Sequence, residues 1–421
     1  MPAVDHLALP LSQPGAGPRE SVETCRALRV LLISHTCQSR TEGQPKAVLL
    51  ARIPDLRLKL LTPDRWLHYG QWRGAETPAS DVGLDLEVSK VRWPWVGPAQ
   101  FYLHWYPRLN QILRAFRPDV IDLWEEPWGL VSAHACWLRN RLLPKAAIVS
   151  ETEQNIDKTL PFPFERFRSY SLRNADYAVG RNAEAVRILR SKGYHGPAEV
   201  VPNAVDTELF RPMDRRACRC ELGLSGFVVG YVGRLVEEKG LMDLLDALKL
   251  CLPQVNLLLV GSGPLQGELE RRSAGLGLGT RVKFLGGRRL DELPAVMNAL
   301  DLLALPSRTT PRWKEQFGRV IIEAHACGVA VIGSNSGAIP EVIGQAGRIV
   351  PEQDPAALAR AIDELAADPS IVRQLGRMGR EQVEKHYTWE RVAGRMAAIY
   401  RRARRYAAGE ACSRDAGEGN P

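Results

Sequence analysis

The chain has 421 residues, a length that favours two or three domains of ordinary size. Hydrophobic residues make up 45% of it and charged residues 25%, which is typical of a globular protein and excludes a mainly disordered chain. The net charge of +8 is not gathered into one long run. This balance fits an anionic ligand or an acidic membrane surface, and no nucleic-acid partner is expected.

The cysteines and the two ends of the chain predict a cytoplasmic protein. Cys218 and Cys220 have no second cysteine pair and no histidine nearby, so we expect free thiols in a reducing compartment and no zinc site. Residues 1–26 lack a basic start followed by an apolar run, so they are expected to be a disordered extension and not a signal peptide. Residues 408–421 are expected to be a disordered tail. No apolar run reaches about 18 residues, so no membrane-spanning helix is predicted.

Short apolar runs alternate with helical patterns, which predicts an α/β fold with parallel sheets. The clearest helical patterns are Leu241–Leu250 and Pro355–Ala367. The segment "VPNAVDTELFRP", Val201–Pro212, carries two prolines and no sustained periodicity, so we place a domain linker there. This gives two doubly wound, Rossmann-like domains, 27–205 and 206–388, with ligands expected at the carboxyl ends of their strands. The predicted strands are 29–34, 56–61, 119–123, 146–150, 177–179, 199–201, 227–232, 255–260, 281–285, 302–305, 330–333 and 348–350.

Two loops of the second half place glycines beside strand ends. In "YVGRLVEEKG" the strand ends before Gly233, and Arg234 and Lys239 flank the turn into a helix, so this loop is a candidate anion site. In "VGSGPLQG" the glycine spacing is close to a dinucleotide fingerprint, but Gly267 comes one position late. The next strand is also followed by no acidic residue to hold a ribose, so a redox dehydrogenase is disfavoured.

The stretch "KEQFGRVIIEAHACG", Lys314–Gly328, places two glutamates eight positions apart at the start of an apolar helix. Glu315 precedes the helix, and Glu323 lies in its second turn. The loops "FLGGRR" and "GSNSG" offer open backbone and free N–H groups at two further strand ends. Each loop alone is compatible with an ordinary turn. Together they place Gly, Arg, Lys and Glu where they would face one cleft.

These motifs, in this order and spacing, resemble those of the family-4 glycosyltransferases, which have the GT-B fold of two Rossmann-like domains facing a cleft. The resemblance rests on "YVGRLVEEKG", "LLVGSGP", "FLGG", "DLLALPS", "EAHACGVAVIGSNSGAIPEVI", the Glu315/Glu323 pair and the linker "VPNAVDTELF". It covers most of the second half. It also implies that the C-terminal helix, residues 389–407, crosses back to the first domain, with Val392, Met396, Ile399, Tyr400 and Ala403 on one face.

The resemblance implies roles for individual residues. Arg234 and Lys239 match the pair that neutralises the diphosphate of a nucleotide-sugar donor. Glu315 matches the glutamate that contacts hydroxyls of the donor sugar, and Glu323 matches the one that accepts hydrogen bonds from the ribose. Arg234, Lys239 and Glu315 are therefore the expected catalytic residues. The other positions expected to contact the donor are Gly233, Arg288, Gln316, Phe317, Gly318 and Arg319.

The resemblance also implies the chemistry. Departure of a nucleoside diphosphate builds negative charge, which two cations and a helix N-terminus stabilise without a metal. No Asp-x-Asp motif occurs in the sequence, so neither a metal nor another cofactor is expected. The implied activity is the transfer of a sugar, with retention of configuration, from a nucleoside-diphosphate sugar to a hydroxyl of a glycan, a glycolipid or a small-molecule glycoside.

The first half departs from the family pattern. Where members carry a Gly-Gly pair after the first strand, this chain reads "SHTCQSRTEGQPKAV", with Gly43 as the single candidate. The histidine that many members carry after the strand "AAIVS" is absent, and the chain continues "ETEQN". The residues expected to line the acceptor site are Gly43, Glu125, Glu126, Glu153 and Asn155. Glu126 or Glu153 is the expected base-like group, and solvated loop charges are the alternative.

The partners and two other functions stay open at this point. The aromatic and basic stretch 90–116 is compatible with peripheral binding to a membrane or with a place in the core. Its aromatic residues are Trp93, Trp95, Phe101, Tyr102, Trp105 and Tyr106. A sugar-nucleotide epimerase or phosphorylase of the same fold is disfavoured by the five strand-end loops of the second half described above, taken together. An inactive sugar-nucleotide or carbohydrate-binding protein remains the alternative, because the first half is atypical.

Overall fold

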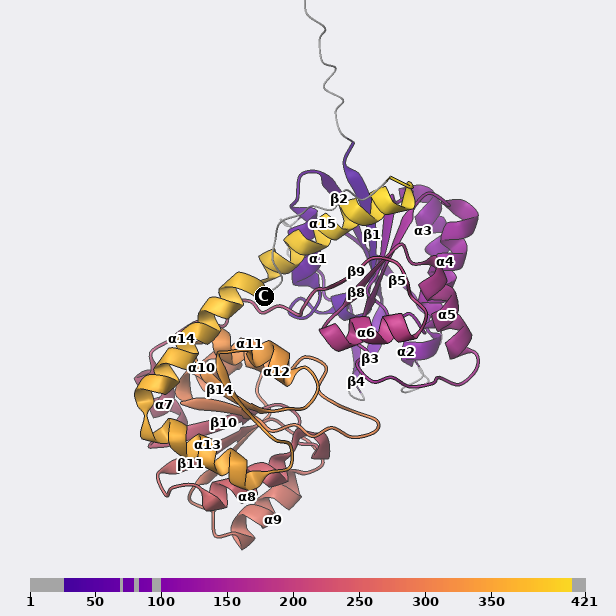
Figure 1. The fold of residues 1–421 in the computed structure, drawn as a ribbon. Helices are drawn as coiled ribbons and strands as arrows, with labels where there is room; N and C mark the ends of the chain where they lie inside the picture. Colours follow the sequence, from indigo (N-terminus) through magenta and orange to yellow (C-terminus); the bar gives the residue numbers. More distant parts are fainter. Residues whose placement is uncertain (1–25, 69–70, 79–82, 93–99, 411–421) are drawn as a thin grey trace, which may run out of the picture.

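Two parallel sheets, each covered by helices, form the framework of the protein in a computed structural model that describes residues 26–68, 71–78, 83–92 and 100–410 (Figure 1). The first sheet has the strand order β5-β2-β1-β6-β7-β8-β9 and the second β12-β11-β10-β13-β14-β15. Every pairing within the two sheets is parallel. The strand order reverses between β1 and β6 in the first sheet and between β10 and β13 in the second. These switch points are where doubly wound sheets bind ligands.

The first domain contains seven sheet strands and a separate hairpin among the described residues. The strands are β1 (Leu28–Ile33), β2 (Leu56–Pro63), β5 (Asp85–Ser89), β6 (Val120–Leu123), β7 (Ala147–Thr152), β8 (Tyr177–Gly180) and β9 (Ala198–Val200). The antiparallel hairpin is β3 (Arg65–His68) with β4 (Gln71–Gly74). The helices are η1 (Thr36–Gln38), α1 (Gln44–Ala51), α2 (Gln100–Leu103), α3 (Leu109–Phe116), α4 (Leu130–Leu142), α5 (Phe164–Asn174) and α6 (Ala183–Ser191).

The second domain repeats the strand–helix alternation. Its strands are β10 (Phe227–Val232), β11 (Val255–Val260), β12 (Val282–Gly286), β13 (Leu302–Leu305), β14 (Ala330–Ser334) and β15 (Gly347–Val350). Its helices are α7 (Arg215–Leu222), η3 (Glu237–Lys239), α8 (Leu241–Leu250), α9 (Gln266–Gly275), η4 (Leu290–Glu292), α10 (Leu293–Ala299), α11 (Arg319–Ala326), α12 (Ile339–Ile343), α13 (Pro355–Ala367) and α14 (Pro369–His386). Strands such as β10, "FVVGYV", are continuous apolar runs because helices cover both faces of the sheet.

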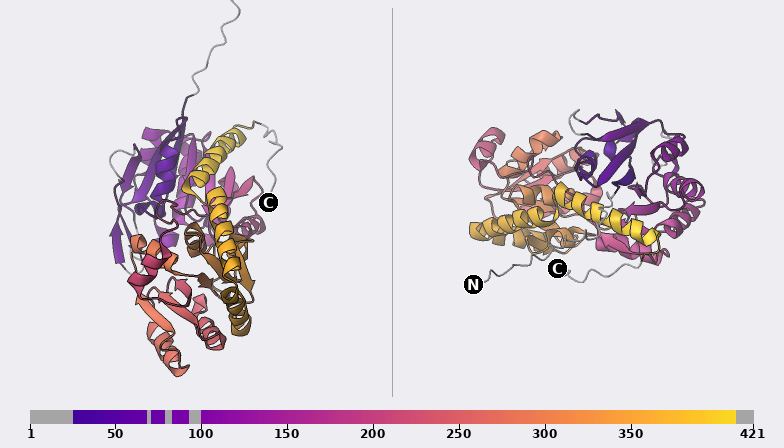
Figure 2. Two further views of the ribbon diagram at one scale, coloured as in Figure 1. Left: turned by 90° about the vertical axis from the view of Figure 1, so that its left-hand side faces the viewer. Right: turned by 90° about the horizontal axis from the view of Figure 1, so that it is seen from above.

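The helix α15 (Trp389–Ala407) follows α14 and crosses to the first domain, as the sequence predicted (Figures 1 and 2). Its predicted apolar face is buried against strands and helices of that domain. Tyr400 Oη donates a 2.6 Å hydrogen bond to Asp122 at the heart of the first sheet. The six arginines between 391 and 405 therefore lie on a helix whose other face belongs to the core, so it is not a free basic arm.

The predicted strands are all present, with ends shifted by no more than two residues. The predictions missed β5 and the β3–β4 hairpin. β5 is an edge strand with exposed charged residues, so it lacks the apolar run that marks the central strands. The hairpin stands outside both sheets, and its formation depends on packing that no local pattern shows.

Candidate active site

The donor-side loops meet at the switch point of the second sheet, between the ends of β10 and β13. Gly233 directly follows β10, and a Cβ atom on Gly261, which directly follows the neighbouring β11, would lie 1.8 Å from the Gly233 carbonyl oxygen. Gly240, with φ 67°, is equally constrained, because its Cβ would lie 1.9 Å from the carbonyl oxygen of Pro306. These glycines allow the backbones of three strand-end loops to touch, and this contact brings their charged residues together.

Two of the predicted catalytic residues form an ion pair. Lys239 Nζ lies 2.5 Å from Glu315 Oε2, which also accepts a 3.1 Å hydrogen bond from the hydroxyl of Ser307. The Glu315 residue is 8% exposed, and Lys239 also lies 4.7 Å from the centre of the Trp313 ring. The carboxylate is therefore the more buried partner of this pair, and the ammonium group is the more exposed one. The ammonium group of Lys239 has three N–H donors, so it can bind a ligand anion while it remains paired with Glu315.

Arg234 is the second residue after β10. Its side chain is exposed, and its carbonyl oxygen accepts a 2.7 Å hydrogen bond from the hydroxyl of Tyr231, a buried residue of β10. Arg234 and Lys239 thus come from the two ends of one short loop, which runs from β10 through η3. The loop that follows β10 therefore carries two cationic residues.

Glu323 lies on α11 and lines a narrow pocket between the domains. Arg319, Leu290 and Val205 line this pocket as well, and residues of the β1–α1 loop close it from the first domain. Within the described residues, the Glu323 carboxylate makes no hydrogen bond or ion pair. Burial raises the pKa of Glu323, and the positive charge of Arg319, one turn earlier on the helix, partly opposes this. A carboxylate that is partly buried and unpaired favours a ligand that donates hydrogen bonds.

The remaining donor-side residues lie around the start of α11. Gly318 precedes the helix with φ 79°, and a Cβ there would lie 2.8 Å from Ile321 Cδ1, so glycine suits the turn. The Phe317 side chain is buried in the core, where its ring centre is 5.8 Å from that of Tyr387. Only its backbone is therefore available to a donor. Gln316 is exposed, and Arg288 is partly exposed beside Glu292, with 3.9 Å between the charged groups.

Two of the predicted acceptor-side glutamates are engaged with the protein itself. Glu125 is buried and accepts hydrogen bonds from His35 at 2.6 Å to the main-chain nitrogen and 2.7 Å to Nδ1. Glu126 accepts 2.6 Å and 2.8 Å hydrogen bonds from the Thr152 hydroxyl and the Glu153 amide. Burial raises the pKa of Glu126 to about 7, although those two hydrogen bonds oppose the shift. Glu126 is thus the acceptor-side carboxyl that exchanges a proton near neutral pH.

The other three acceptor-side predictions have distinct positions. Glu153 is partly exposed, 3.4 Å from Arg181. Asn155 is 2% exposed and bonds across the domains to the Glu315 carbonyl oxygen, so it contacts the donor loop directly. Gly43 precedes α1, and a Cβ there would lie 2.8 Å from the backbone of Thr36. A larger residue at Gly43 would push the β1–α1 loop out of place.

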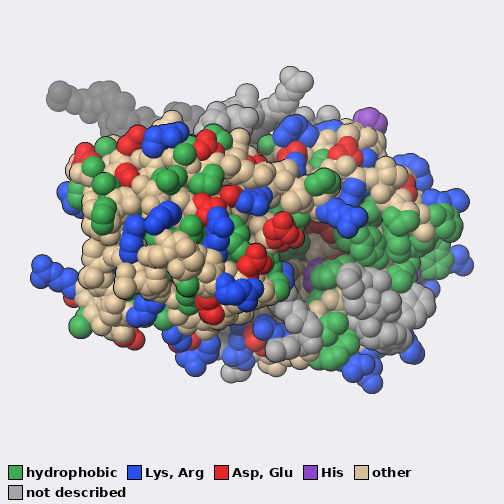
Figure 3. Space-filling model, turned by 90° about the horizontal axis from the view of Figure 1, so that it is seen from below, with side chains coloured by type: hydrophobic (Ala, Val, Ile, Leu, Met, Phe, Trp, Pro, Cys, Tyr) green, Lys and Arg blue, Asp and Glu red, His purple; other side chains and the backbone are tan. Residues whose placement is uncertain are grey.

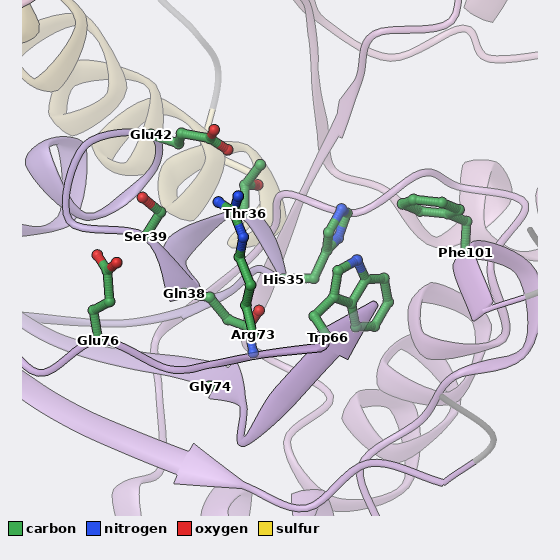
Figure 4. Close-up of a pocket in the computed structure, with 10 residues that line it drawn as sticks. All are labelled: His35, Thr36, Gln38, Ser39, Glu42, Trp66, Arg73, Gly74, Glu76 and Phe101. Atoms are coloured by element: carbon green, nitrogen blue, oxygen red, sulfur yellow. The ribbon is translucent and has the colours of Figure 1, made fainter. Parts of the chain in front are cut away.

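The sequence reasoning missed His35, which is the second residue after β1. Its ring stacks on Trp66 of the β3–β4 hairpin, with 4.6 Å between ring centres, and it lines a pocket with Phe101 and Arg73 (Figure 4). Figure 4 shows the Arg73 side chain reaching from the hairpin toward Thr36. Burial alone would lower the pKa of His35, but the Glu125 carboxylate outweighs it, and the pKa is raised. The available signal was a histidine after β1 and a glutamate after the neighbouring β6, which meet at the switch point.

The hollow between the two domains is open to solvent. Figure 3 shows it from below, with acidic and histidine side chains visible inside it. Among the described residues, no group of three or more His, Cys, Asp or Glu side chains is arranged to hold a metal ion. In the same part of the chain, every helix is too short or too polar to span a lipid bilayer.

Comparison with known proteins matches both halves of the chain. A family model described as "Glycosyl transferases group 1" matches residues 222–382, and one described as "Glycosyltransferase Family 4" matches residues 71–209. The chain belongs to glycosyltransferase family 4. The match over 71–209 covers most of the first domain, whose motifs depart from the family pattern.

Three similar proteins show how far the likeness to other family members extends. The chain is 35% identical to the D-inositol 3-phosphate glycosyltransferase of Mycobacterium leprae (strain TN) over 40% of either chain. It is 37% identical to the GDP-mannose-dependent alpha-(1-6)-phosphatidylinositol monomannoside mannosyltransferase of Mycolicibacterium smegmatis, over 41% of this chain and 49% of that one. These alignments span about half or less of the relatives' lengths.

The fold is matched over a longer part of the chain. The structure of Anabaena Alr3699/HepE in complex with UDP superposes with a TM-score of 0.71 and 22% identity, over 89% of this chain and all of that one. At this identity, the likeness concerns the fold. It confirms the predicted GT-B architecture of two Rossmann-like domains.

Proposed function

We propose that this family-4 member is a retaining glycosyltransferase that moves a sugar from a nucleoside-diphosphate sugar to a hydroxyl group of an acceptor. The observation that carries the proposal is that Lys239 pairs with Glu315 beside the strand ends of the second domain, while Glu323 of the same domain lines a pocket that faces the first domain. The relatives named as glycosyltransferases support it, including one described as dependent on GDP-mannose. HepE, whose fold is similar, binds UDP in its crystal structure.

The donor would be bound through its diphosphate, its sugar and its ribose. Arg234, Lys239 and the N-terminus of α11 supply positive charge where the leaving diphosphate becomes more negative. Glu323 accepts hydrogen bonds from the ribose hydroxyls, which its unpaired carboxylate favours. Glu315 accepts them from the sugar. Because cations from the chain meet the diphosphate, we propose that transfer needs no metal and no other cofactor.

The acceptor would enter from the first domain, through the pocket that His35 lines. The rings of Trp66 and Phe101, which meet edge to face, offer an apolar wall, and the hydroxyl groups of Thr36 and Ser39 offer hydrogen bonds. This mixture suits a carbohydrate, either free or linked to a lipid, because a sugar presents both C–H faces and hydroxyl groups. We propose that His35 and Glu126 are the titratable groups that contact the acceptor hydroxyl.

We also propose that the protein is cytoplasmic and can bind the surface of an anionic membrane. Between α4 and α5 lies a groove lined by Trp137, which is 49% exposed, and by Arg166 and Arg173, both exposed. Exposed aromatic and cationic side chains are a combination that binds lipid headgroups. Of the aromatic residues first considered, Tyr106 is buried in the core and Phe101 is 40% exposed, while Trp93 and Trp95 lie outside the described residues. Binding to phosphatidylglycerol vesicles should weaken in Trp137→Ala, and equal binding by the wild type and the variant would contradict this.

The activity itself is tested in two steps. Thermal shift with UDP, GDP and ADP should show stabilisation by at least one of them, because ligands that bind the native state raise its melting temperature. The matching sugar nucleotides, such as UDP-glucose or GDP-mannose, should then be hydrolysed slowly without an acceptor. Nucleotide binding without hydrolysis or transfer would favour the alternative, a sugar-nucleotide-binding protein. No shift with any nucleotide would contradict the proposal.

A further inference from the structure

Two asparagines of the first domain hold the main chain of the donor loop in the second. Asn155 Nδ2 donates a 2.8 Å hydrogen bond to the carbonyl oxygen of Glu315, and Asn182 Nδ2 donates a 2.5 Å bond to that of Gln316. Both asparagines are buried, at 2% and 1% exposed. They come from different segments, the loop after β7 and the residue before α6, yet they bond to neighbouring carbonyls of one loop.

The residues next to Asn182 extend this contact. The amide nitrogen of Ala183 donates a 3.3 Å hydrogen bond to Glu341 Oε2, and Glu184 Oε1 lies 2.6 Å from Lys314 Nζ. Three consecutive residues at the start of α6 therefore contact the second domain. Two of them contact the donor loop itself, on either side of Glu315.

The second domain fixes the same loop from the opposite side. The Glu315 carbonyl oxygen also accepts a 3.0 Å hydrogen bond from the amide of Ala338. Gly337, with φ 54°, packs so tightly there that a Cβ would lie 2.0 Å from that oxygen. The Glu315 side chain is held by Lys239 and Ser307, both of the second domain. The contribution of the first domain is thus confined to the loop backbone.

We propose that Asn155 and Asn182 are positioning residues for sugar transfer, which hold Glu315 in place for the donor sugar when the two domains are docked. This inference rests on the proposed function. The nucleotide part of the donor would contact Arg234, Lys239 and Glu323. Among the described contacts, neither Lys239 nor Glu323 bonds to either asparagine. Loosening the two hydrogen bonds should therefore impair the sugar-transfer step and leave nucleotide binding nearly unchanged.

The variant Asn182→Asp separates two roles of this residue. Asn182 Oδ1 caps α6 by accepting a 2.8 Å hydrogen bond from the Ala185 amide, and aspartate is an equally good cap. The new carboxylate, however, has no N–H to donate and faces the Gln316 carbonyl oxygen. Asn155→Asp has the same effect on the Glu315 carbonyl. Asn182→Ser, a second variant, keeps a capping oxygen but is too short to replace the amide. Asn110→Asp, on the exposed face of α3, is the control for the added charge.

The experiment measures three quantities in each full-length variant. The affinity for UDP, GDP or ADP, whichever binds the wild type, should stay within about twofold. The kcat for transfer from the corresponding sugar nucleotide should fall about tenfold, the size expected for losing a buried hydrogen bond. Amide hydrogen exchange of residues 306–318 should become faster, because a loop with fewer bonds opens more often. Asn110→Asp should match the wild type in all three.

Different results overturn different claims. Wild-type kcat and unchanged exchange in both Asn155→Asp and Asn182→Asp would refute the positioning role. A fall in kcat matched by an equal loss of nucleotide affinity would also refute it, because the defect would then be a general loss of structure. If the wild type itself transfers no sugar, the proposed function fails. The exchange measurement then still decides whether the two asparagines hold the loop.

Discussion

The two domains build their sides of the cleft in different ways. In the second domain, the charged residues follow the ends of strands in short glycine-rich loops, where the buried Glu315 pairs with the partly exposed Lys239. In the first domain, the corresponding glutamates point inward. Glu125 is buried beneath His35, and Glu126 is bonded to the segment after β7.

The two domains also differ in the charged groups that they present to the cleft. The second domain presents cations and one unpaired carboxylate, Glu323, which together suit a nucleotide with a diphosphate and a ribose. The first domain uses most of its buried charges to hold its own strands and helices together. Glu151, for example, pairs with Lys46 and Arg181 at the centre of the domain. The chemistry of donor binding is thus concentrated on one side of the cleft, and the other side contributes shape, an aromatic wall and a histidine.

The largest expected effect comes from Lys239→Ala. The variant removes one of the two cations placed to meet the leaving diphosphate and leaves the carboxylate of Glu315 without its partner. Removing one such electrostatic contact lowers kcat by about 100-fold or more. Steady-state kinetics with the hydrolysed sugar nucleotide would show this.

Lys249→Ala is the matched control, because Lys249 is exposed near the end of α8, away from the strand ends. It should retain wild-type kcat. Equal activity of Lys239→Ala and Lys249→Ala would show that the charge of Lys239 does not contribute to transfer. The proposed electrostatic difference between the two domains would then be wrong.

A smaller effect is expected for Glu323→Gln. The amide keeps the shape of the side chain but accepts weaker hydrogen bonds from a ribose, so the affinity for the nucleoside diphosphate should fall about tenfold. Burial raises the pKa of Glu323, so its charged form is disfavoured in the folded protein, and the neutral amide should leave the melting temperature unchanged or higher. Isothermal titration and a thermal melt measure the two quantities.

Glu364→Gln, on the exposed face of α13, serves as the comparison, and it should change neither quantity. Loss of stability in Glu323→Gln without loss of nucleotide affinity would show that Glu323 is structural. The second domain would then resemble the first in how it uses its carboxylates.

The positions of the donor-side residues in the fold could be predicted because they are set by local geometry, and their roles in donor binding stay a prediction. A strand, a glycine turn and a helix start leave few possible positions for Lys239 or for Glu315, and each is readable from the adjacent residues. What the sequence could not show is that these two side chains pair with each other. That contact depends on how β10 and β13 lie side by side in the sheet.

The acceptor side could be predicted only in part. The strands were found, and Glu125 and Glu126 were placed correctly at the end of β6. Their partners were not, because His35 and Glu125 are 90 positions apart and meet only through the pairing of β1 with β6. The hairpin that carries Trp66 has no sequence signature strong enough to set it apart from the surrounding loops. Tertiary packing, which no local pattern encodes, therefore decides what this side of the cleft presents.

The smallest effect is expected at the pair of Glu125 and His35, and it concerns the first domain alone. In Glu125→Gln the main charge that raises the pKa of His35 is gone, so burial should bring that pKa below its ordinary value of 6.5. A raised histidine pKa contributes stability that is present in full below pH 6.5 and is lost as the pH rises through the pKa of the folded state. The stability difference between the wild type and Glu125→Gln should therefore be largest at about pH 6 and shrink as the pH rises.

Histidine NMR, with His35→Gln to assign the signal, measures the pKa directly, and chemical denaturation at several pH values measures the stability. The KM for the acceptor should rise about fivefold in Glu125→Gln, since a misplaced histidine loses one hydrogen bond, while donor hydrolysis without an acceptor should be unchanged. An unchanged pKa of His35 would mean that the pair is not formed in solution. A rise in the KM for the donor would instead place His35 on the donor side. The assignment of donor binding to the second domain alone would then be wrong.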